Sequence, residues 1–123
     1  MKKAVYTNKA PKPIGPYSQA VIKDDMIFIS GQVGIDPNTG KRGSTVEEQT
    51  KLALNNLEQI LRSAGSSLEK VCKTTIILKD LADFETVNKV YSEFFKTEPP
   101  ARTTFQANPP NGYLVEIEAI AIL

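Results

Sequence analysis

The chain contains no histidine and a single cysteine, Cys72, among its 123 residues. Without histidine, one chain cannot use Ser-His or Cys-His catalysis or bind a metal through imidazole. One cysteine also excludes an internal disulfide and a thiolate zinc cluster. Chemistry must therefore rest on arginine, carboxylates, hydroxyls, amides, backbone N–H groups and water. We expect no metal and no cofactor, and we expect Cys72 to be a packed core thiol.

A strong excess of charge and long apolar runs are absent too. Lys and Arg number 15 and Asp and Glu 14, which gives a net charge of +1. This balance provides no electrostatic footprint for nucleic acid or for an anionic membrane. No apolar stretch approaches the roughly 20 residues of a membrane span, and no apolar segment follows the basic N-terminus as in a signal peptide. We therefore expect a cytoplasmic protein that binds neither nucleic acid nor membrane.

The pattern of apolar residues predicts two helices among about six strands. A capping box at residues 44–48 precedes an apolar stripe that ends near Gly65, and a second stripe predicts a helix over about 80–96. Strands are expected at residues 1–10, 17–22, 26–30, 71–78, 103–107 and 114–123. These elements fit one domain, residues 1–123, with an α+β fold. We expect a mixed six-stranded sheet with both helices on one face.

The last strand carries apolar residues on both of its faces. One face presents Val115, Ile117, Ala119, Ala121 and Leu123, and the other presents Glu116, Glu118, Ile120 and Ile122. Because two helices cover only one face of a sheet, we expect the other face to pack against a partner subunit in a closed homo-oligomer.

Arg102 is the strongest candidate for a functional residue. It follows Pro99-Pro100-Ala101, so the backbone before it is restricted, and its planar guanidinium suits a carboxylate or a phosphate. Glu116 and Glu118 come shortly afterwards and offer a general base, whose pKa burial raises and a nearby arginine lowers. This combination predicts a site for a small organic acid. The alternative is that Arg102 merely pairs with Glu116 or Glu118.

Four further residues are weaker candidates. Tyr17 follows a rigid Gly-Pro loop and either contacts a ligand or covers the core. Gly31 ends a strand, so its backbone amide can approach an anion closely, while the neighbouring Ser30 has no histidine to activate it. Asn88 lies beside an apolar helix stripe, where it is either a satisfied edge group or a side chain that points into a pocket.

These residues, in this order, resemble the RidA/YjgF family of reactive-intermediate imine deaminases over nearly the whole chain. The segments that carry the resemblance are Ala10-Pro11, Ile14-Gly15-Pro16-Tyr17-Ser18-Gln19, Ile29-Ser30-Gly31-Gln32, Lys79-Asp80-Leu81-Ala82-Asp83-Phe84, Val87-Asn88-Lys89-Val90-Tyr91, Pro100-Ala101-Arg102 and Val115-Glu116-Ile117-Glu118-Ala119-Ile120-Ala121. The resemblance implies a chorismate-mutase-like subunit, a homotrimer with three clefts between neighbours, and catalysis without metal or cofactor.

The resemblance also implies roles for individual residues. Arg102 would clamp the substrate carboxylate, and Glu116 would position or activate water, with Glu118 as the alternative if the strand register slips by two. The expected substrate-binding residues are Tyr17, Ser30, Gly31, Asn88 and Thr104. Thr104 stands where many members have cysteine, and segment 105–112 departs from the aliphatic run of many relatives.

The implied reaction is hydrolysis of short 2-imino acids, 2-iminobutanoate and 2-iminopropanoate, to 2-keto acids and ammonia. The first alternative is a non-catalytic trimer that binds a small acid and regulates a partner protein. A third class, endoribonuclease or translation inhibitor, also occurs among family descriptions, and the near-neutral charge and missing histidine disfavour it.

Overall fold

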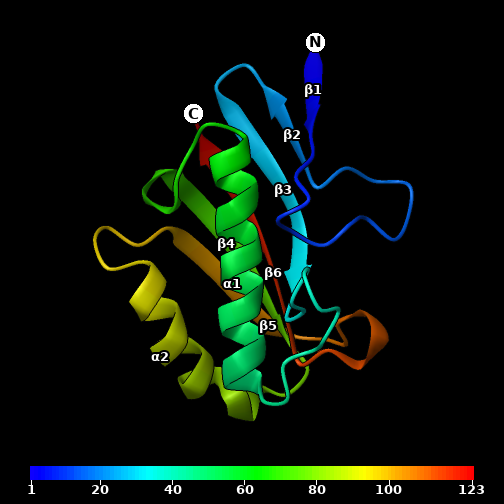
Figure 1. Cartoon of the computed structure of the whole chain (residues 1–123). Helices are drawn as coiled ribbons and strands as arrows, with labels where there is room; N and C mark the ends of the chain where they lie inside the picture. Colours follow the sequence, from blue (N-terminus) through cyan, green and yellow to red (C-terminus); the bar gives the residue numbers. More distant parts are fainter.

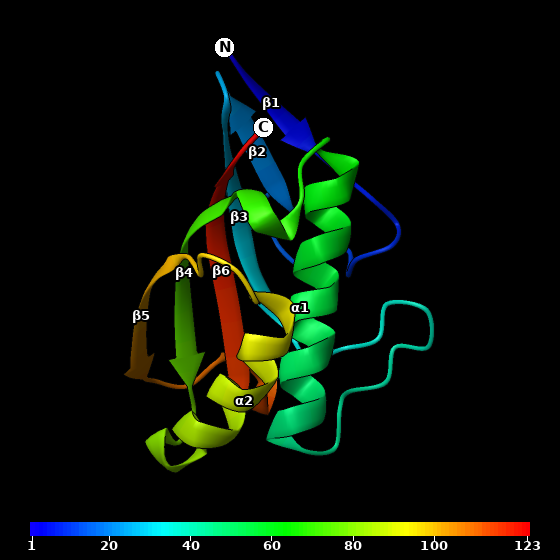
Figure 2. The ribbon, with the colours of Figure 1, turned by 90° about the vertical axis from the view of Figure 1, so that its left-hand side faces the viewer.

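Two helices pack on one face of a six-stranded sheet in the computed structural model, which describes residues 1–123 (Figures 1 and 2). The elements in chain order are β1 (Lys2–Val5), β2 (Ala20–Lys23), β3 (Met26–Val33), α1 (Val46–Ser63), β4 (Val71–Leu78), α2 (Phe84–Phe94), β5 (Ala101–Gln106) and β6 (Val115–Ile122). The strands lie in the order β1-β2-β3-β6-β4-β5. Only β4 and β5 pair in parallel, so the sheet is mixed, as predicted.

Helix α1 begins and ends where the local sequence predicts. The Thr45 hydroxyl accepts a hydrogen bond from the Glu48 backbone N–H at 3.1 Å, and the Glu48 carboxylate accepts from the Ser44 N–H at 2.8 Å. The first bond satisfies an N–H group that the first turn of a helix leaves free, and the second ties down the residue before the cap. At the other end, Gly65 adopts a φ of 85°, which a residue with a side chain rarely adopts.

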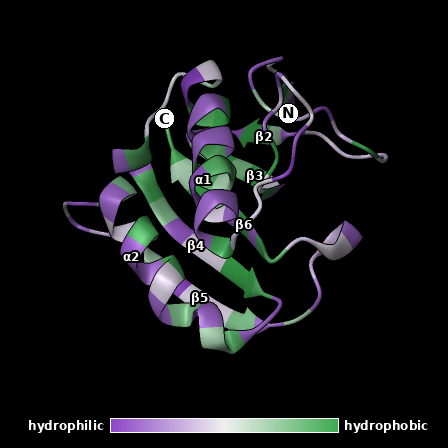
Figure 3. Ribbon diagram, turned by 60° about the horizontal axis from the view of Figure 1, so that its bottom comes forward, coloured by the Kyte–Doolittle hydropathy of each residue, from purple (hydrophilic) through white to green (hydrophobic).

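The core lies between the helices and the sheet. Its fully buried large side chains include Leu54, Leu57, Ile60 and Leu61 on α1, Val87 on α2, and Ile27, Ile76, Leu78, Val115 and Ile117 on the strands. Figure 3 shows hydrophobic segments along β4 and β6 beneath the helices. Burial of each such side chain stabilises the fold by roughly 1.5–3 kcal/mol. Neither helix has the length and hydrophobicity that a membrane crossing requires.

Strand β6 confirms the predicted alternation over most of its length. Val115, Ile117, Ala119 and Ala121 are buried under the helices. Glu116, Glu118, Ile120 and Ile122 lie on the opposite face, which no element of the chain covers. The prediction was wrong for Leu123, which lies beyond the strand and is exposed.

Some predicted boundaries were wrong. Strand β2 begins at Ala20, and Tyr17 and Ser18 belong to a loop. The buried Gln19 side chain holds that loop, because its amide bonds to the backbone of Thr7 and Pro11 at 2.7–3.0 Å. Helix α2 ends at Phe94, two residues earlier than expected.

Cys72 is exposed and is not a core thiol, which corrects the prediction. The pairing of β4 with β6 shifts between Val71 and Lys73, so Cys72 is the extra residue of a β-bulge. A bulge changes which face later residues occupy. The buried positions of β4 therefore resume at Thr74, and the thiol is left outside the core.

Candidate active site

Glu116 sits above a glycine on the uncovered face of the sheet. Strand β6 pairs with β3, and the ladder skips Ser30 and Gly31, because its register shifts between Ile29 and Gln32. A Cβ added to Gly31 would lie 2.8 Å from the Glu116 carboxyl carbon and 2.9 Å from Cγ. The carboxylate therefore occupies the space that a side chain at Gly31 would take.

The environment of Glu116 raises the pKa of its carboxyl group above the ordinary value. Burial is the larger cause, and the negative charge of Glu118 on the same face is the smaller one. No lysine or arginine of the chain forms an ion pair with Glu116. A carboxyl group with a raised pKa can hold a proton nearer to neutral pH, as proton transfer to and from a substrate requires.

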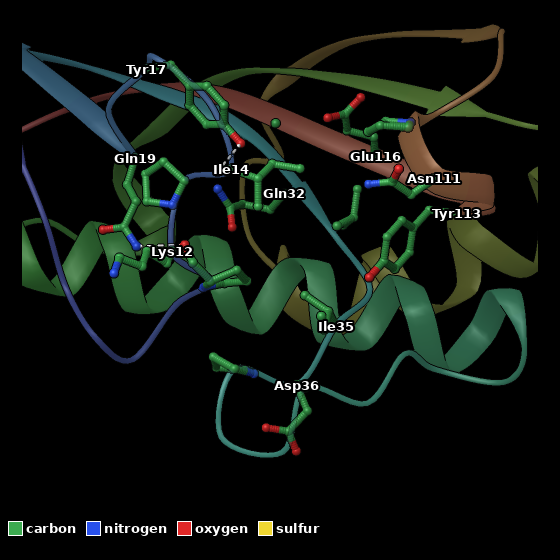
Figure 4. A pocket seen from close by; sticks show the side chains of 17 residues that line it. Lys12, Ile14, Tyr17, Gln19, Gln32, Ile35, Asp36, Asn111, Tyr113 and Glu116 are labelled. Atoms are coloured by element: carbon green, nitrogen blue, oxygen red, sulfur yellow. Dashed lines mark hydrogen bonds between the residues drawn. The ribbon is translucent and has the colours of Figure 1, made fainter.

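A cavity of about 350 Å³ opens beside Glu116 and Gly31 (Figure 4). In the figure, Glu116, Asn111 and Tyr113 lie along one side of the cavity, and Tyr17 lies on the opposite side. The Tyr17 hydroxyl accepts a hydrogen bond from the Ile14 N–H at 3.4 Å, so the phenol folds back onto its own loop. The volume is enough for a small organic acid.

Ser30 does not line the cavity, but its hydrogen bonds hold the loop next to it. Its hydroxyl donates a hydrogen bond to the Ser18 carbonyl at 2.6 Å. Its own N–H donates to the Gln19 carbonyl at 2.9 Å. Ser30 thus fixes the loop that carries Tyr17, and the proton of its hydroxyl is already engaged.

Arg102 occupies a different place, on the edge strand β5. It pairs with Thr74 of β4, whose side chain is fully buried on the helix side of the sheet. The guanidinium carbon lies 4.9 Å from the centre of the Tyr91 ring and 5.5 Å from that of Phe84, both on α2. Arg102 forms no ion pair within the chain. The alternative, that it merely pairs with Glu116 or Glu118, is therefore wrong for a single chain.

Asn88 and Thr104 lie near this arginine. Asn88 is four residues after Phe84 and three before Tyr91 on α2, so all three share one helix face. Thr104 is two residues after Arg102 and shares its side of β5. The Thr104 hydroxyl is buried without a hydrogen-bond partner, and an unpaired buried polar group is costly unless something else satisfies it. This cluster thus has a free cation and a free hydroxyl.

Within one chain, the expected site residues form two groups that lie apart from each other. Tyr17, Ser30, Gly31 and Glu116 adjoin the cavity or its wall. Arg102, Asn88 and Thr104 lie together at the β5 edge. Strand pairing puts Arg102 on the helix side of the sheet, in register with Thr74, and Glu116 on the uncovered side, in register with Ile77. One chain therefore does not place Arg102 beside Glu116.

Sequence reasoning missed several residues of the cavity wall. Tyr113 is buried in it, with the Arg42 guanidinium 3.9 Å above its ring. Asn111, which adopts a φ of 55°, and Ile35 also line it. The run Asn108-Pro109-Pro110-Asn111-Gly112 is typical of a loop between strands, but no local signal indicates that this loop closes a cavity. No group of three or more Cys, Asp or Glu side chains is placed to hold a metal ion.

Comparisons with known proteins identify the family. A family model described as Endoribonuclease L-PSP matches residues 7–123. The human protein named 2-iminobutanoate/2-iminopropanoate deaminase is 48% identical over 124 residues, covering 99% of this chain and 90% of the human one.

Two solved structures share the fold over nearly their whole length. A putative endoribonuclease from Thermotoga maritima is 46% identical, with a TM-score of 0.96, and the match covers 100% of this chain and 98% of the other. TdcF from E. coli, solved with bound serine, is 39% identical, with a TM-score of 0.95 and 98% of both chains covered. The chain therefore belongs to the Endoribonuclease L-PSP family, which is the RidA/YjgF family that its sequence resembles.

Proposed function

We propose that this protein is a deaminase that hydrolyses 2-iminobutanoate and 2-iminopropanoate to 2-keto acids and ammonia. The observation that carries the proposal is the half-buried Glu116 carboxyl group, whose pKa is raised, at the mouth of a cavity of about 350 Å³. The name of the human relative, which matches along 99% of this chain, supports the same activity. Bound serine in a second relative fits a small amino-acid-like ligand.

We further propose that the active unit is a homotrimer whose sites lie between subunits. The uncovered face of the sheet carries the exposed side chains of Met26, Phe28, Phe105 and Ile122. A second copy covering them would remove large apolar groups from water. The separation of Arg102 from Glu116 supports the same arrangement, because Arg102 of a neighbour can complete the site that Glu116 begins.

In this mechanism the substrate carboxylate pairs with the Arg102 guanidinium through two parallel hydrogen bonds. Cation–π contacts with the Tyr91 and Phe84 rings help to hold the guanidinium in place. The Gly31 backbone N–H donates a hydrogen bond to the substrate from the side of the site opposite Arg102. Tyr17, Asn88 and Thr104 form further contacts with the substrate. These interactions orient the imine carbon toward Glu116.

Glu116 then transfers protons from water to the substrate nitrogen. Its carboxylate accepts a proton from water as the water oxygen bonds to the imine carbon, which gives a tetrahedral intermediate. The same proton passes to the imine nitrogen, which becomes an amino group. Glu116 then transfers the proton of the new hydroxyl group to this nitrogen, the carbon–nitrogen bond breaks, and ammonia leaves as the carbonyl of the keto acid forms. One positioned acid–base group accelerates a reaction by about 10²–10⁴-fold. This acceleration is sufficient for an imine, because imines already hydrolyse in water without a catalyst.

The test measures keto-acid release from an imine that a dehydratase generates in the assay. The wild type should accelerate release, and Arg102→Ala and Glu116→Gln should each abolish most of the acceleration. Arg62→Ala is the matched control, because Arg62 is an exposed arginine on α1 paired with Glu58. Normal rates in the Arg102 and Glu116 variants, or no acceleration by the wild type, would refute the proposal.

The family description also names an endoribonuclease, so RNA is the second substrate to test. With a net charge of +1 and no histidine, the chain offers little to bind or cleave RNA. We expect no cleavage of RNA by protein freed of contaminating nuclease. Cleavage that Arg102→Ala removes would favour the nuclease instead.

A further inference from the structure

Gln49, on the first turn of α1, joins two segments that form walls of the cavity. The residue is 3% exposed, and both ends of its side-chain amide form hydrogen bonds. The oxygen Oε1 accepts a hydrogen bond from the Leu114 N–H at 2.8 Å, and Nε2 donates to the Gly43 carbonyl at 3.0 Å. The amide therefore spans from the segment before β6 to the segment before α1.

Two glycines make room for this side chain. A Cβ added to Gly34 would overlap Cα and Cβ of Gln49, and one added to Gly43 would lie 2.8 Å from the Gln49 backbone nitrogen. The Gly43 N–H also donates to the Gly34 carbonyl at 2.9 Å. Segment 34–43, which carries the cavity residues Ile35 and Asp36, is thus closed directly onto the start of α1.

The other partner of Gln49, Leu114, lies just before β6. Besides the bond from its N–H to Gln49, Leu114 accepts a hydrogen bond at its carbonyl from the Lys79 N–H at 3.0 Å. Both backbone groups of Leu114 are therefore engaged. Tyr113 immediately before it lines the cavity, and Glu116 is the second residue of β6.

We propose that Gln49 is a positioning residue for Glu116, acting through the Leu114 N–H to hold the start of β6 so that the carboxylate stays over Gly31. The role of Glu116 in proton transfer rests on the function proposed above. Gln49 touches neither the cavity nor the carboxylate, so its effect on the reaction is transmitted through the backbone. Loss of the amide lets the first residues of β6 move and exposes Glu116 to more water.

The pKa of Glu116 also depends on the charged and ionisable groups around it. Its neighbours across the sheet, Ile77 on β4 and Val33 on β3, carry no charge. The ionisable groups on its own face or along the cavity are Glu118, Lys12, Tyr17, Asp36, Tyr113 and, beyond the end of β4, Lys79. A substitution at Gln49 removes or adds none of these ionisable groups.

The test compares Gln49→Met with Thr50→Val. Methionine has a similar length and cannot reproduce either hydrogen bond. Thr50, the next residue, is fully buried, and its hydroxyl bonds only within α1, to the Val46 carbonyl at 2.7 Å. Thr50→Val therefore removes a hydrogen bond of the same helix that does not involve β6.

The main readout is the pKa of Glu116, measured from the ¹³C chemical shift of its carboxyl carbon, which requires no turnover. In Gln49→Met this pKa should fall toward its ordinary value, and kcat should drop about ten-fold while KM changes little. Thr50→Val should leave both unchanged. If Gln49→Met does not fold, Gln49→Asn replaces it with the same expectation, because its shorter amide cannot reach both partners.

The outcomes separate this proposal from the proposed function. An unchanged Glu116 titration in folded Gln49 variants, or an equal change in Thr50→Val, would overturn the positioning role. If the Glu116 pKa falls in Gln49→Met but the wild-type protein hydrolyses no imine, the positioning role is supported and the deaminase is refuted.

Discussion

Replacing Gly31 with alanine tests whether Glu116 needs the space above this glycine. The new Cβ would lie 2.8 Å from the Glu116 carboxyl carbon, whereas ordinary contacts begin at 3.4 Å. The carboxyl group must therefore retreat by at least about 0.6 Å. The backbone N–H of residue 31 is kept, so a hydrogen bond from it to the substrate remains available.

The expected loss is large in rate and small in stability. Displacement of a reacting group by about 1 Å can cost about 10²-fold, which corresponds to about 2.7 kcal/mol of transition-state stabilisation. Gly31 does not have a positive φ, so alanine introduces no backbone strain there. The contact to relieve is with the flexible end of a side chain, and we expect the free energy of unfolding to change by less than about 1 kcal/mol.

A double-mutant cycle shows whether the loss acts through Glu116. We expect Gly31→Ala to lower kcat/KM by about ten- to a hundred-fold in the wild type, and by less than about two-fold when Glu116→Gln is already present. Steady-state keto-acid release and urea denaturation measure the two quantities. Equal rate losses in both backgrounds would refute the reasoning, because Gly31 would then act independently of the carboxylate.

Three further predictions concern charged groups. Arg102→Lys should lower kcat/KM about 10²-fold in steady-state assays, because an ammonium neither stacks on Tyr91 as a guanidinium does nor binds a carboxylate bidentately; full activity would exclude the clamp. Burial raises the folded-state pKa of Glu116 above 4.5, so the folded protein holds more protons and loses stability as pH rises through that window. In urea denaturation, Glu116→Gln should therefore stabilise the protein more at pH 8 than at pH 4, and the reverse order would contradict the shift. Hydrogen bonds from Ser44 lower the pKa of Glu48, so its stabilisation is present above pH 4.5 and is lost as pH falls through the lower folded value. Glu48→Gln should thus reduce Tm at pH 7 and leave it unchanged at pH 3.

Local sequence signals predicted α1 and β6 well. The hydrogen bonds of Thr45 and Glu48 come from residues within one turn of each other, and the alternation along β6 follows directly from strand geometry. Both features depend on neighbouring residues, so they can be read without knowledge of the fold.

Bulges and strand pairing could not be predicted in this way. Cys72 is an extra residue in its strand, so its thiol lies on the opposite face of the sheet from the one expected. Ser30 and Gly31 are left out of the pairing between β3 and β6, and this irregularity leaves space for Glu116. The side on which Arg102 lies depends on its register with Thr74 in another strand. The sequence therefore indicated the candidate site residues, but not that one chain carries them on opposite faces of its sheet.

We propose that each site combines Arg102 of one subunit with Glu116 of another, and a mixture of two inactive variants tests this arrangement most directly. Arg102→Ala and Glu116→Gln are unfolded together in equal amounts, refolded, and assayed for imine hydrolysis. If neighbours share sites and assort at random, about a quarter of the sites hold both native residues, and about a quarter of the wild-type activity should return. Mixed oligomers that form but remain inactive would contradict the account.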